Sequence, residues 1–362
     1  MLVTAIEAKP LRSLDRVRIE LEPGIVSVIG PNGTGKTNLI EAIYFALTGR
    51  SFRTSDRRDL IPFGGSLARA EATIRDEDGI ERQLLAAVTR SEGRRHLLDG
   101  NPADPATLAR SRPPVAVFAP DRLTLVKGPP AERRAHLDGF VAARWPVRAE
   151  LRKRFGQAVA QRNALLSRLS AGFGSPDDLR IWDAGMAEAA APLVEARAEA
   201  VAELAGPFAA TATELGLTDA ELAYAPRAQG AAEEIRSGLE ERRDQDIRMG
   251  RSSWGPHLDD LKLTAGTKSL RKYGSQGQQR TALLALLFAE REALQAARRV
   301  TPLLLLDDVM SELDPGRRER LVARLGVGGQ VLITAADEDQ VPAAAREHVV
   351  AMPPPQTESV AA

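Results

Sequence analysis

A glycine-rich octapeptide, Gly30 to Thr37 (GPNGTGKT), constrains this chain most, because it matches the phosphate-binding P-loop pattern GxxxxGKT. The residues before it, Gly24 to Ile29 (GIVSVI), are a short β-branched run typical of a buried strand. The residues after it, Asn38 to Leu47 (NLIEAIYFAL), have the apolar spacing of a helix. A strand, a glycine loop and a helix in this order predict a site for a nucleoside triphosphate.

Each residue type in the loop has a chemical reason. Triphosphate oxygens need backbone N–H groups at close range, and glycines permit this because they lack Cβ and tolerate positive φ. The helix start and Lys36 add positive charge, and the Thr37 hydroxyl can hold Mg²⁺. A structural glycine turn before a helix is the alternative, which the GKT ending disfavours. We predict that ATP contacts nine consecutive residues: Gly30, Pro31, Asn32, Gly33, Thr34, Gly35, Lys36, Thr37 and Asn38.

The composition narrows the class of protein. The 362 residues are enough for one large or two ordinary domains. Without cysteine there are no disulfides or thiolate metal sites, and the four scattered histidines argue against a zinc centre. No secretory pattern or membrane-length apolar run is present, so we expect a cytoplasmic protein. The 49 basic and 49 acidic residues cancel, so the total charge predicts no partner.

The order of predicted elements implies an α/β fold assembled from both ends of the chain. Alternating strands dominate the first hundred residues, residues 131–249 read as mostly helical, and strand and helix patterns resume after Trp254. We expect Gly172–Pro176 and Gly206-Pro207 to break the helical region. We therefore predict a split nucleotide-binding ATPase lobe and an inserted, mainly helical lobe: residues 1–112 with 255–362, and residues 113–254.

A second acidic motif follows a buried strand late in the chain. Leu303 to Asp308 (LLLLDD) ends in adjacent carboxylates, which is how P-loop ATPases bring an acid to the Mg²⁺ beside Thr37. Asp307 is the predicted metal-side residue, and Asp308 could orient or deprotonate the attacking water. A strand ending in a solvated Asp-Asp turn is the alternative. We predict Asp308 and Lys36 as the catalytic residues.

The segment YGSQGQQR, Tyr273 to Arg280, leads into an apolar helix and offers N–H groups and a serine hydroxyl to a phosphate. Alone it would be an ordinary capped helix. The order P-loop, SQGQQR and LLLLDDVMSELD, however, resembles the ATP-binding-cassette ATPases, and SQGQQR resembles their signature motif. That resemblance implies an ABC-type head whose signature contacts ATP held by a second copy. The residues concerned are Ser275, Gln276, Gly277 and Gln278, with Ser311 and Asp314 in the D-loop.

Two departures from the cassette pattern bear on ATP hydrolysis. Ala335 stands where many cassette proteins carry the switch histidine. Asp308 stands in place of the usual glutamate, which implies slow hydrolysis.

Several longer strings resemble the RecF family of bacterial recombination proteins over nearly the whole chain. They are GPNGTGKTNLIEAI, RSFR, FAPDRLTLVKGPPAERRAHLD, QRNALL, GPHLDDL and SQGQQRTALLALLFAE. The resemblance implies a DNA-binding protein that dimerises with ATP, associates with duplex DNA beside single-strand gaps, and works with RecR and RecO to load RecA. Leu258 departs from it, because arginine is expected there. The alternatives are the nucleotide-binding subunit of a transporter and a chromosome-maintenance head, which would need a long coiled coil.

DNA contacts in such a protein should be made mostly to phosphates, and therefore be independent of sequence and sensitive to salt. The scarcity of tyrosine and tryptophan disfavours a groove that stacks single-stranded bases. Three basic clusters are candidates: Arg50, Arg53, Arg57 and Arg58; Arg133 and Arg134; and Arg148, Arg152, Lys153 and Arg154.

Overall fold

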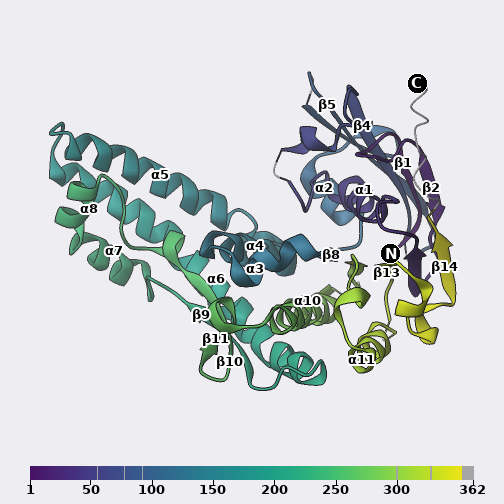
Figure 1. Ribbon diagram of the computed structural model, residues 1–362. Coiled ribbons are helices and arrows are strands. Elements are labelled where there is room, and N and C mark those ends of the chain that lie inside the picture. Colours follow the sequence, from purple (N-terminus) through teal and green to yellow (C-terminus); the bar gives the residue numbers. More distant parts are fainter. Residues whose placement is uncertain (55, 77, 92, 299–300, 327, 353–362) are drawn as a thin grey trace, which may run out of the picture. The chain divides into compact units, whose positions relative to one another are not determined.

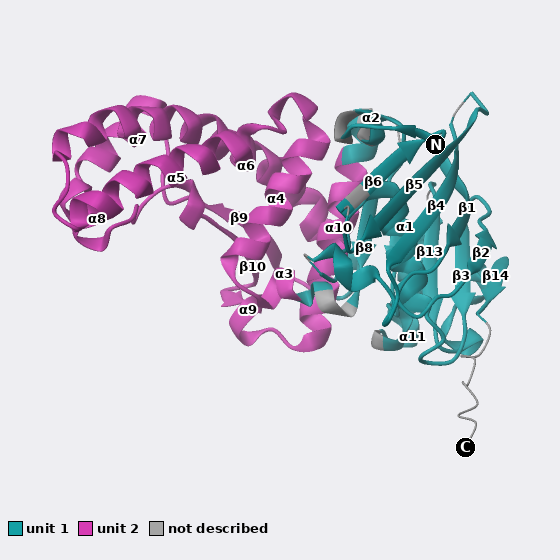
Figure 2. Cartoon of the chain, turned by 90° about the horizontal axis from the view of Figure 1, so that it is seen from above, with its two compact units in different colours: residues 1–123, 214–216, 294–362 teal, residues 124–213, 217–293 magenta. Residues whose placement is uncertain are grey.

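The computed structural model describes residues 1–54, 56–76, 78–91, 93–298, 301–326 and 328–352. The chain divides into two compact units (Figure 2). Unit 1 contains residues 1–123, 214–216 and 294–362, and unit 2 contains residues 124–213 and 217–293. These limits differ from those of the predicted lobes. The proline pair at 113 and 114 precedes another strand of the ATPase sheet, and residues 255–293 belong to the inserted unit.

Five parallel strands form the sheet that carries the P-loop. Their spatial order is β14 (His348–Ala351), β3 (Ile25–Ile29), β13 (Val331–Ala335), β12 (Leu303–Leu306) and β8 (Val115–Phe118). All four leucines of β12 are buried, as expected for a parallel strand covered on both faces. Among the residues that the structure describes, the P-loop strand β3 pairs with β13 and β14 alone, and both come from the C-terminal part of the sequence. The predicted assembly from both chain ends is confirmed.

A second, antiparallel sheet lies in the same unit. Its order is β2 (Val17–Glu20), β1 (Leu2–Ala8), β4 (Leu67–Arg75), β5 (Glu81–Thr89), β6 (Gly93–Leu98) and β7 (Asn101–Pro102). In β4, buried residues alternate with partly exposed ones, so that one face of the sheet contributes to a core.

Helix α1 (Lys36–Thr48) begins at the P-loop and forms the centre of the core of unit 1 (Figure 1). Leu39, Ile43 and Phe45 are completely buried. They belong to one apolar cluster that includes Val28 of the parallel sheet and Ile74 of the antiparallel sheet. Packing on both sheets therefore holds the helix that bears Lys36 and Thr37. The unit also contains the α-helices α2 (Pro105–Arg110) and α11 (Pro315–Leu325).

Unit 2 is mainly helical and includes a small antiparallel sheet. The sheet has the order β11 (Lys268–Ser269), β10 (Asp260–Ala265) and β9 (Ala220–Ala225). Two of the helices, α6 and α10, end in residues assigned to unit 1. The helices are α3 (Thr124–Lys127), α4 (Pro130–Arg144), α5 (Leu151–Ser170), α6 (Leu179–Glu214), α7 (Ala232–Glu240), α8 (Arg243–Met249), α9 (Leu270–Tyr273) and α10 (Gln276–Arg298).

The predicted break at Gly206-Pro207 is wrong, whereas the break at 172–176 is confirmed. Helix α6 continues through Pro207 because Leu204 and Phe208 on either side are 1% and 0% exposed. Burying two such side chains contributes roughly 3–6 kcal/mol, which offsets the roughly 3 kcal/mol cost of an interior proline. Strand β9 was not predicted, because the sequence pattern of residues 131–249 indicates mostly helices.

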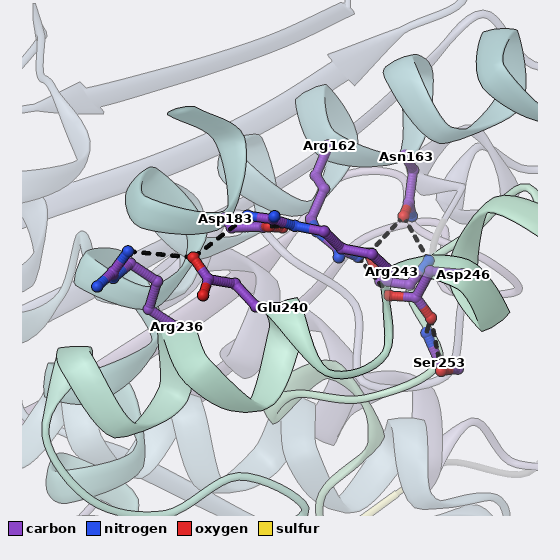
Figure 3. A network of polar contacts seen from close by, with 9 residues as sticks. Arg162, Asn163, Asp183, Arg236, Glu240, Arg243, Asp246 and Ser253 are labelled. Atoms are coloured by element: carbon purple, nitrogen blue, oxygen red, sulfur yellow. Dashed lines mark hydrogen bonds and ion pairs between the residues drawn. The ribbon is translucent and has the colours of Figure 1, made fainter. Parts of the chain in front are cut away.

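A buried polar network joins the helices of unit 2 (Figure 3). Arg162 on α5 donates to Asp183 on α6 at 2.7 Å and to Asp246 on α8 at 2.6 Å. All three side chains are 0% exposed. Arg243 donates to the second oxygen of Asp183 at 2.6 Å. The negative charges of the two buried carboxylates, Asp183 and Asp246, are thus compensated by the guanidinium groups of Arg162 and Arg243.

Candidate functional site

The P-loop has the backbone conformation that its glycines allow. Gly33 and Gly35 have φ values of 87° and 94°, which other residues rarely adopt. A Cβ at Gly35 would also lie 2.7 Å from Cδ2 of Leu14. Gly35 is the N-cap of α1, so the first N–H groups of the helix have no intrahelical acceptor. The loop therefore has the geometry of an anion site.

Lys36 lies within this loop and is 8% exposed. Its Nζ donates to the carbonyl oxygens of Gly30 at 2.5 Å and Pro31 at 2.9 Å. Burial lowers the pKa of Lys36, while the nearby Asp308 and Asp307 carboxylates act in the opposite direction. The ammonium group is thus held at the loop, where a phosphate oxygen would be a stronger acceptor than a carbonyl.

Asp307 is placed directly after β12 and is 3% exposed. Its Oδ2 accepts a hydrogen bond from Thr37 Oγ1 at 2.8 Å, and its Oδ1 accepts one from Thr334 Oγ1 at 2.8 Å. Burial raises the pKa of Asp307, and the two hydroxyl donors oppose that rise. The structure therefore brings together the two residues that the sequence assigned to Mg²⁺. A hydroxyl and a carboxylate are suitable oxygen ligands, to which substrate phosphates would add others.

Asp308 has a left-handed backbone with φ of 49°. Its N–H donates to Thr334 Oγ1 at 2.9 Å, and its carbonyl accepts from Ser311 Oγ at 2.9 Å. Its Oδ1 is buried and accepts no hydrogen bond from the described residues. An unsatisfied carboxylate oxygen of this kind can accept a proton or a water hydrogen bond.

The remaining loop residues differ in exposure. Pro31, Asn32 and Gly33 are exposed, whereas Thr34 is buried and donates from Oγ1 to the Pro31 carbonyl at 3.0 Å. Asn38 lies at the edge of the site, where its Nδ2 donates to Ser13 Oγ at 2.8 Å.

Ala335 ends strand β13 and is 1% exposed. Its carbonyl accepts a long hydrogen bond, 3.3 Å, from the N–H of Gly30. A methyl group cannot sense a phosphate by hydrogen bonding, so the role of a switch histidine is not reproduced by this side chain.

Two features of the site were missed by the sequence reasoning. Thr334 contacts both acidic residues, and its only sequence signal is a polar residue near the end of an apolar strand. Glu41 is completely buried in α1 and accepts a bidentate pair from Arg12 at 2.9 and 3.0 Å. A lone acid inside the apolar run LIEAI was the available signal for Glu41.

The predicted signature lies in unit 2 and forms the start of α10. Ser275 accepts from the N–H of Gln278 at 3.2 Å, and the Gln278 side chain accepts from the N–H of Ser275 at 2.9 Å. This reciprocal capping box orders the turn. Ser275, Gln276 and Gln278 are exposed, and Gly277 is half-buried.

The predicted D-loop residues lie in the segment between β12 and α11. Ser311 is exposed, and Asp314 is the N-cap of α11, where its carboxylate accepts from the N–H of Arg317 at 3.0 Å. Both side chains therefore have local structural contacts within unit 1.

Most of the candidate DNA-binding arginines have acidic partners. Arg133 is 2% exposed and forms a bidentate pair with Asp260, so it is inaccessible to DNA and that prediction is wrong. Arg134 is half-buried and donates to the carbonyl of Asp259. Five other basic residues of the three candidate clusters form ion pairs: Arg53 with Glu41, Arg58 with Asp56, Arg148 with Glu199, Arg152 with Asp138 and Lys153 with Glu150.

The fold and the P-loop site define a P-loop ATPase head of the ABC type, and residues 2–358 match the family model for the RecF/RecN/SMC N-terminal domain. Relatives named DNA replication and repair protein RecF are similar over almost the full chain. The one from Streptomyces avermitilis is 36% identical and covers 94% of this chain and 95% of its own. The one from Myxococcus xanthus is 35% identical and covers 96% and 94%. The chain therefore belongs to the RecF family.

Solved structures support the same assignment. A structure of the recombination mediator protein RecF with ATP, in the RecFOR pathway, has a TM-score of 0.84 and 27% identity, and covers 94% of this chain and 93% of that one. An Smc head domain from Pyrococcus furiosus, with a TM-score of 0.57 and 19% identity over 97% of this chain and 93% of that one, shares the fold alone. Among the described residues, no helix is sufficiently long and apolar to cross a membrane.

Proposed function

We propose that this protein is an ATP-controlled DNA-binding protein of recombinational repair, in which ATP joins two copies on duplex DNA. The main observation in support of ATP binding is the 2.8 Å hydrogen bond between Thr37 and Asp307. It joins the P-loop to the acidic strand end, as Mg²⁺-dependent nucleotide binding requires.

Each residue of the proposed site has a distinct task. Lys36 and the N–H groups of the loop bind phosphate oxygens, and Thr37 and Asp307 are the residues that would hold Mg²⁺. Bound Mg²⁺ would neutralise phosphate charge. Asp308, with its unsatisfied Oδ1, orients or deprotonates the attacking water. Because Asp308 stands where cassette ATPases usually have a glutamate, we propose slow hydrolysis, which suits a switch better than a fast enzyme.

The switch works through the exposed signature. In the proposed dimer, Ser275 and the N-terminus of α10 in one copy contact the terminal phosphate of ATP bound by the other copy. Exposure of Ser275 and Gln276 supports this, since neither is covered within unit 2. ATP would stabilise the dimer and ADP would not, because ADP lacks the bridging phosphate.

We place this function in the cytoplasm. The proposed DNA ligand is duplex DNA beside single-strand gaps, and the proposed proteins of the same pathway are RecR, RecO and RecA. Support comes from the relatives' name and from the RecF structure assigned to the RecFOR pathway with ATP. A transporter subunit is not favoured by these relatives. A chromosome-maintenance tether is not favoured either, because the longest helix of the inserted unit has 36 residues.

Fluorescence anisotropy with gapped, duplex and single-stranded DNA, each with ATP, ADP or no nucleotide, tests this function. We expect binding that requires ATP and prefers DNA containing a duplex. Light scattering should show an ATP-dependent dimer. Equal binding to single strands in all nucleotide states, or a monomer in ATP with DNA present, would contradict the proposal.

A further inference from the structure

Basic residues gather in unit 2 on the segment that precedes the signature. The chain has only seven lysines, and three of them lie between residues 262 and 272. Residues 261–289 contain no aspartate or glutamate. We call the four basic residues of this stretch the presignature cluster: Lys262, Lys268, Arg271 and Lys272.

All four side chains of the presignature cluster are exposed. None forms an ion pair with any residue that the structure describes, in contrast to the paired arginines above. Two acids lie near Lys262 on this sheet: Asp260, two residues earlier in β10 and already paired with Arg133, and Glu221, which lies opposite Thr264. Four cations therefore face solvent with little local compensation.

The four residues of the cluster lie on three consecutive elements that contact one another: strands β10 and β11 and helix α9. Strands β10 and β11 form a hairpin in which Lys268 pairs with Ala265. With about 3.3 Å per residue and 4.8 Å between strands, the Cα atoms of Lys262 and Lys268 lie about 11 Å apart. Because Lys268 shares its face with Ala265, three residues from Lys262, the two side chains leave opposite faces of the hairpin, and both reach solvent. Arg271 and Lys272 follow within one turn of helix α9, which packs on the hairpin. A strand of B-DNA carries one phosphate per about 3.4 Å of its axis, so a surface of this size spans several phosphates.

We infer that the presignature cluster is a surface that binds the phosphate backbone of DNA, an inference that rests on the proposed function. The charge of the cluster is complementary to that backbone. Lysine ammonium groups are mobile point charges without a fixed fork geometry, which suits contacts that do not depend on base sequence. Tyr273, 70% exposed beside the cluster, adds a hydroxyl that can donate to phosphate. The position next to Ser275 connects this surface to the nucleotide switch.

The test is a full-length variant with all four residues replaced by glutamine: Lys262→Gln, Lys268→Gln, Arg271→Gln and Lys272→Gln. Its affinity for fluorescent duplex DNA is measured by anisotropy with ATP between about 50 and 200 mM salt. We expect affinity to fall about tenfold or more at low salt, and the slope of log K against log salt to decrease by about 3–4. ATP-dependent dimerisation, measured by light scattering, should be unchanged.

A matched control removes the same number of positive charges from the same unit, at sites that have acidic partners and lie outside the candidate DNA-binding clusters: Arg144→Gln, Arg180→Gln, Arg236→Gln and Arg242→Gln. An equal loss of DNA binding in the control would overturn the inference, since net charge alone would explain it. Unchanged DNA binding by the cluster variant would overturn it too, and favour an acidic protein partner. Loss of dimerisation would assign the cluster to ATP phosphates of the second copy instead.

Failure of the proposed function can be distinguished from failure of this inference. If the proposed function is wrong, the unaltered protein itself does not bind DNA in an ATP-dependent way. Should the fourfold variant not fold, as judged by thermal unfolding, the double variant Lys268→Gln/Lys272→Gln is measured in the same assay. Its salt slope should decrease by about 2. A slope equal to that of the unaltered protein would overturn the inference.

Discussion

Thr37 Oγ1 and Asp307 Oδ2 lie 2.8 Å apart, although 270 residues separate them in the sequence. The first is fixed by a helix buried between two sheets, and the second by the end of a fully buried strand. Their contact depends on the parallel sheet being complete.

Asp307→Asn should stabilise the nucleotide-free protein while abolishing its stabilisation by Mg²⁺-ATP. Burial raises the pKa of Asp307, so the folded chain binds the proton more tightly than the unfolded chain, and stability is lost as the pH rises through the folded pKa. The neutral amide should increase the free energy of unfolding by roughly 0.5–2 kcal/mol at pH 8. This advantage should shrink as the pH falls toward the ordinary carboxyl value. Thermal unfolding measures both effects, and a gain independent of pH would contradict the argument.

Lys36→Ala should weaken ATP binding by about 10–150-fold, because a charge-assisted contact of roughly 1.5–3 kcal/mol is removed. Titration calorimetry with ATP gives the affinity directly. Lys9→Ala is the control, since Lys9 contacts Glu7 on the antiparallel sheet. Undiminished affinity in the Lys36 variant would remove this residue from the site.

Asp308→Asn should retain ATP and accumulate the dimer, with hydrolysis reduced about 100-fold or more. Asparagine tolerates the left-handed backbone at this position, so the fold should be preserved. Phosphate release and light scattering are measured on the same sample. Hydrolysis at the original rate would show that Asp308 does not activate water.

Ser275→Arg should leave ATP binding by the monomer intact and prevent the ATP-dependent dimer, because a long cation would occupy the exposed start of α10. The substitution also removes a helix cap worth about 1 kcal/mol. Ser275→Ala removes the same cap without adding bulk, so it should weaken the dimer less. A dimer of normal affinity in the arginine variant would rule out the proposed interface.

Arg162→Leu should destabilise unit 2 by about 3–5 kcal/mol, since it leaves the carboxylates of Asp183 and Asp246 buried with one guanidinium fewer. Urea unfolding followed by circular dichroism provides the measurement. Arg154→Leu is the surface control, and it should change stability by no more than about 0.5 kcal/mol. Similar stabilities of the two variants would mean that the network is not important for folding.

The sequence was most informative where local pattern and chemistry coincide. The P-loop, its flanking strand and helix, and the run LLLLDD were each recognisable because a few adjacent residues define them. Strands β8 and β14 were not recognised, since neither adjoins a recognisable motif and each is specified by its partners in the sheet.

Long-range pairing explains why the position of Arg133 was mispredicted and why Thr334 was missed. Arg133 looked like a surface arginine, but its partner Asp260 lies 127 positions away. The hydrogen bonds of Thr334 to the two acidic residues likewise connect different strands. No local window contains both members of such a pair, so only the folded structure reveals them.

The strand order also governs when the nucleotide site can form during protein synthesis. Strand β3 leaves the ribosome early, yet both of its hydrogen-bonded neighbours lie between residues 331 and 351. At about 5–20 residues per second, the P-loop strand waits roughly 15–60 s for them. Residues 124–293 emerge in the meantime, so the inserted unit can acquire its structure on the nascent chain before the ATPase core exists.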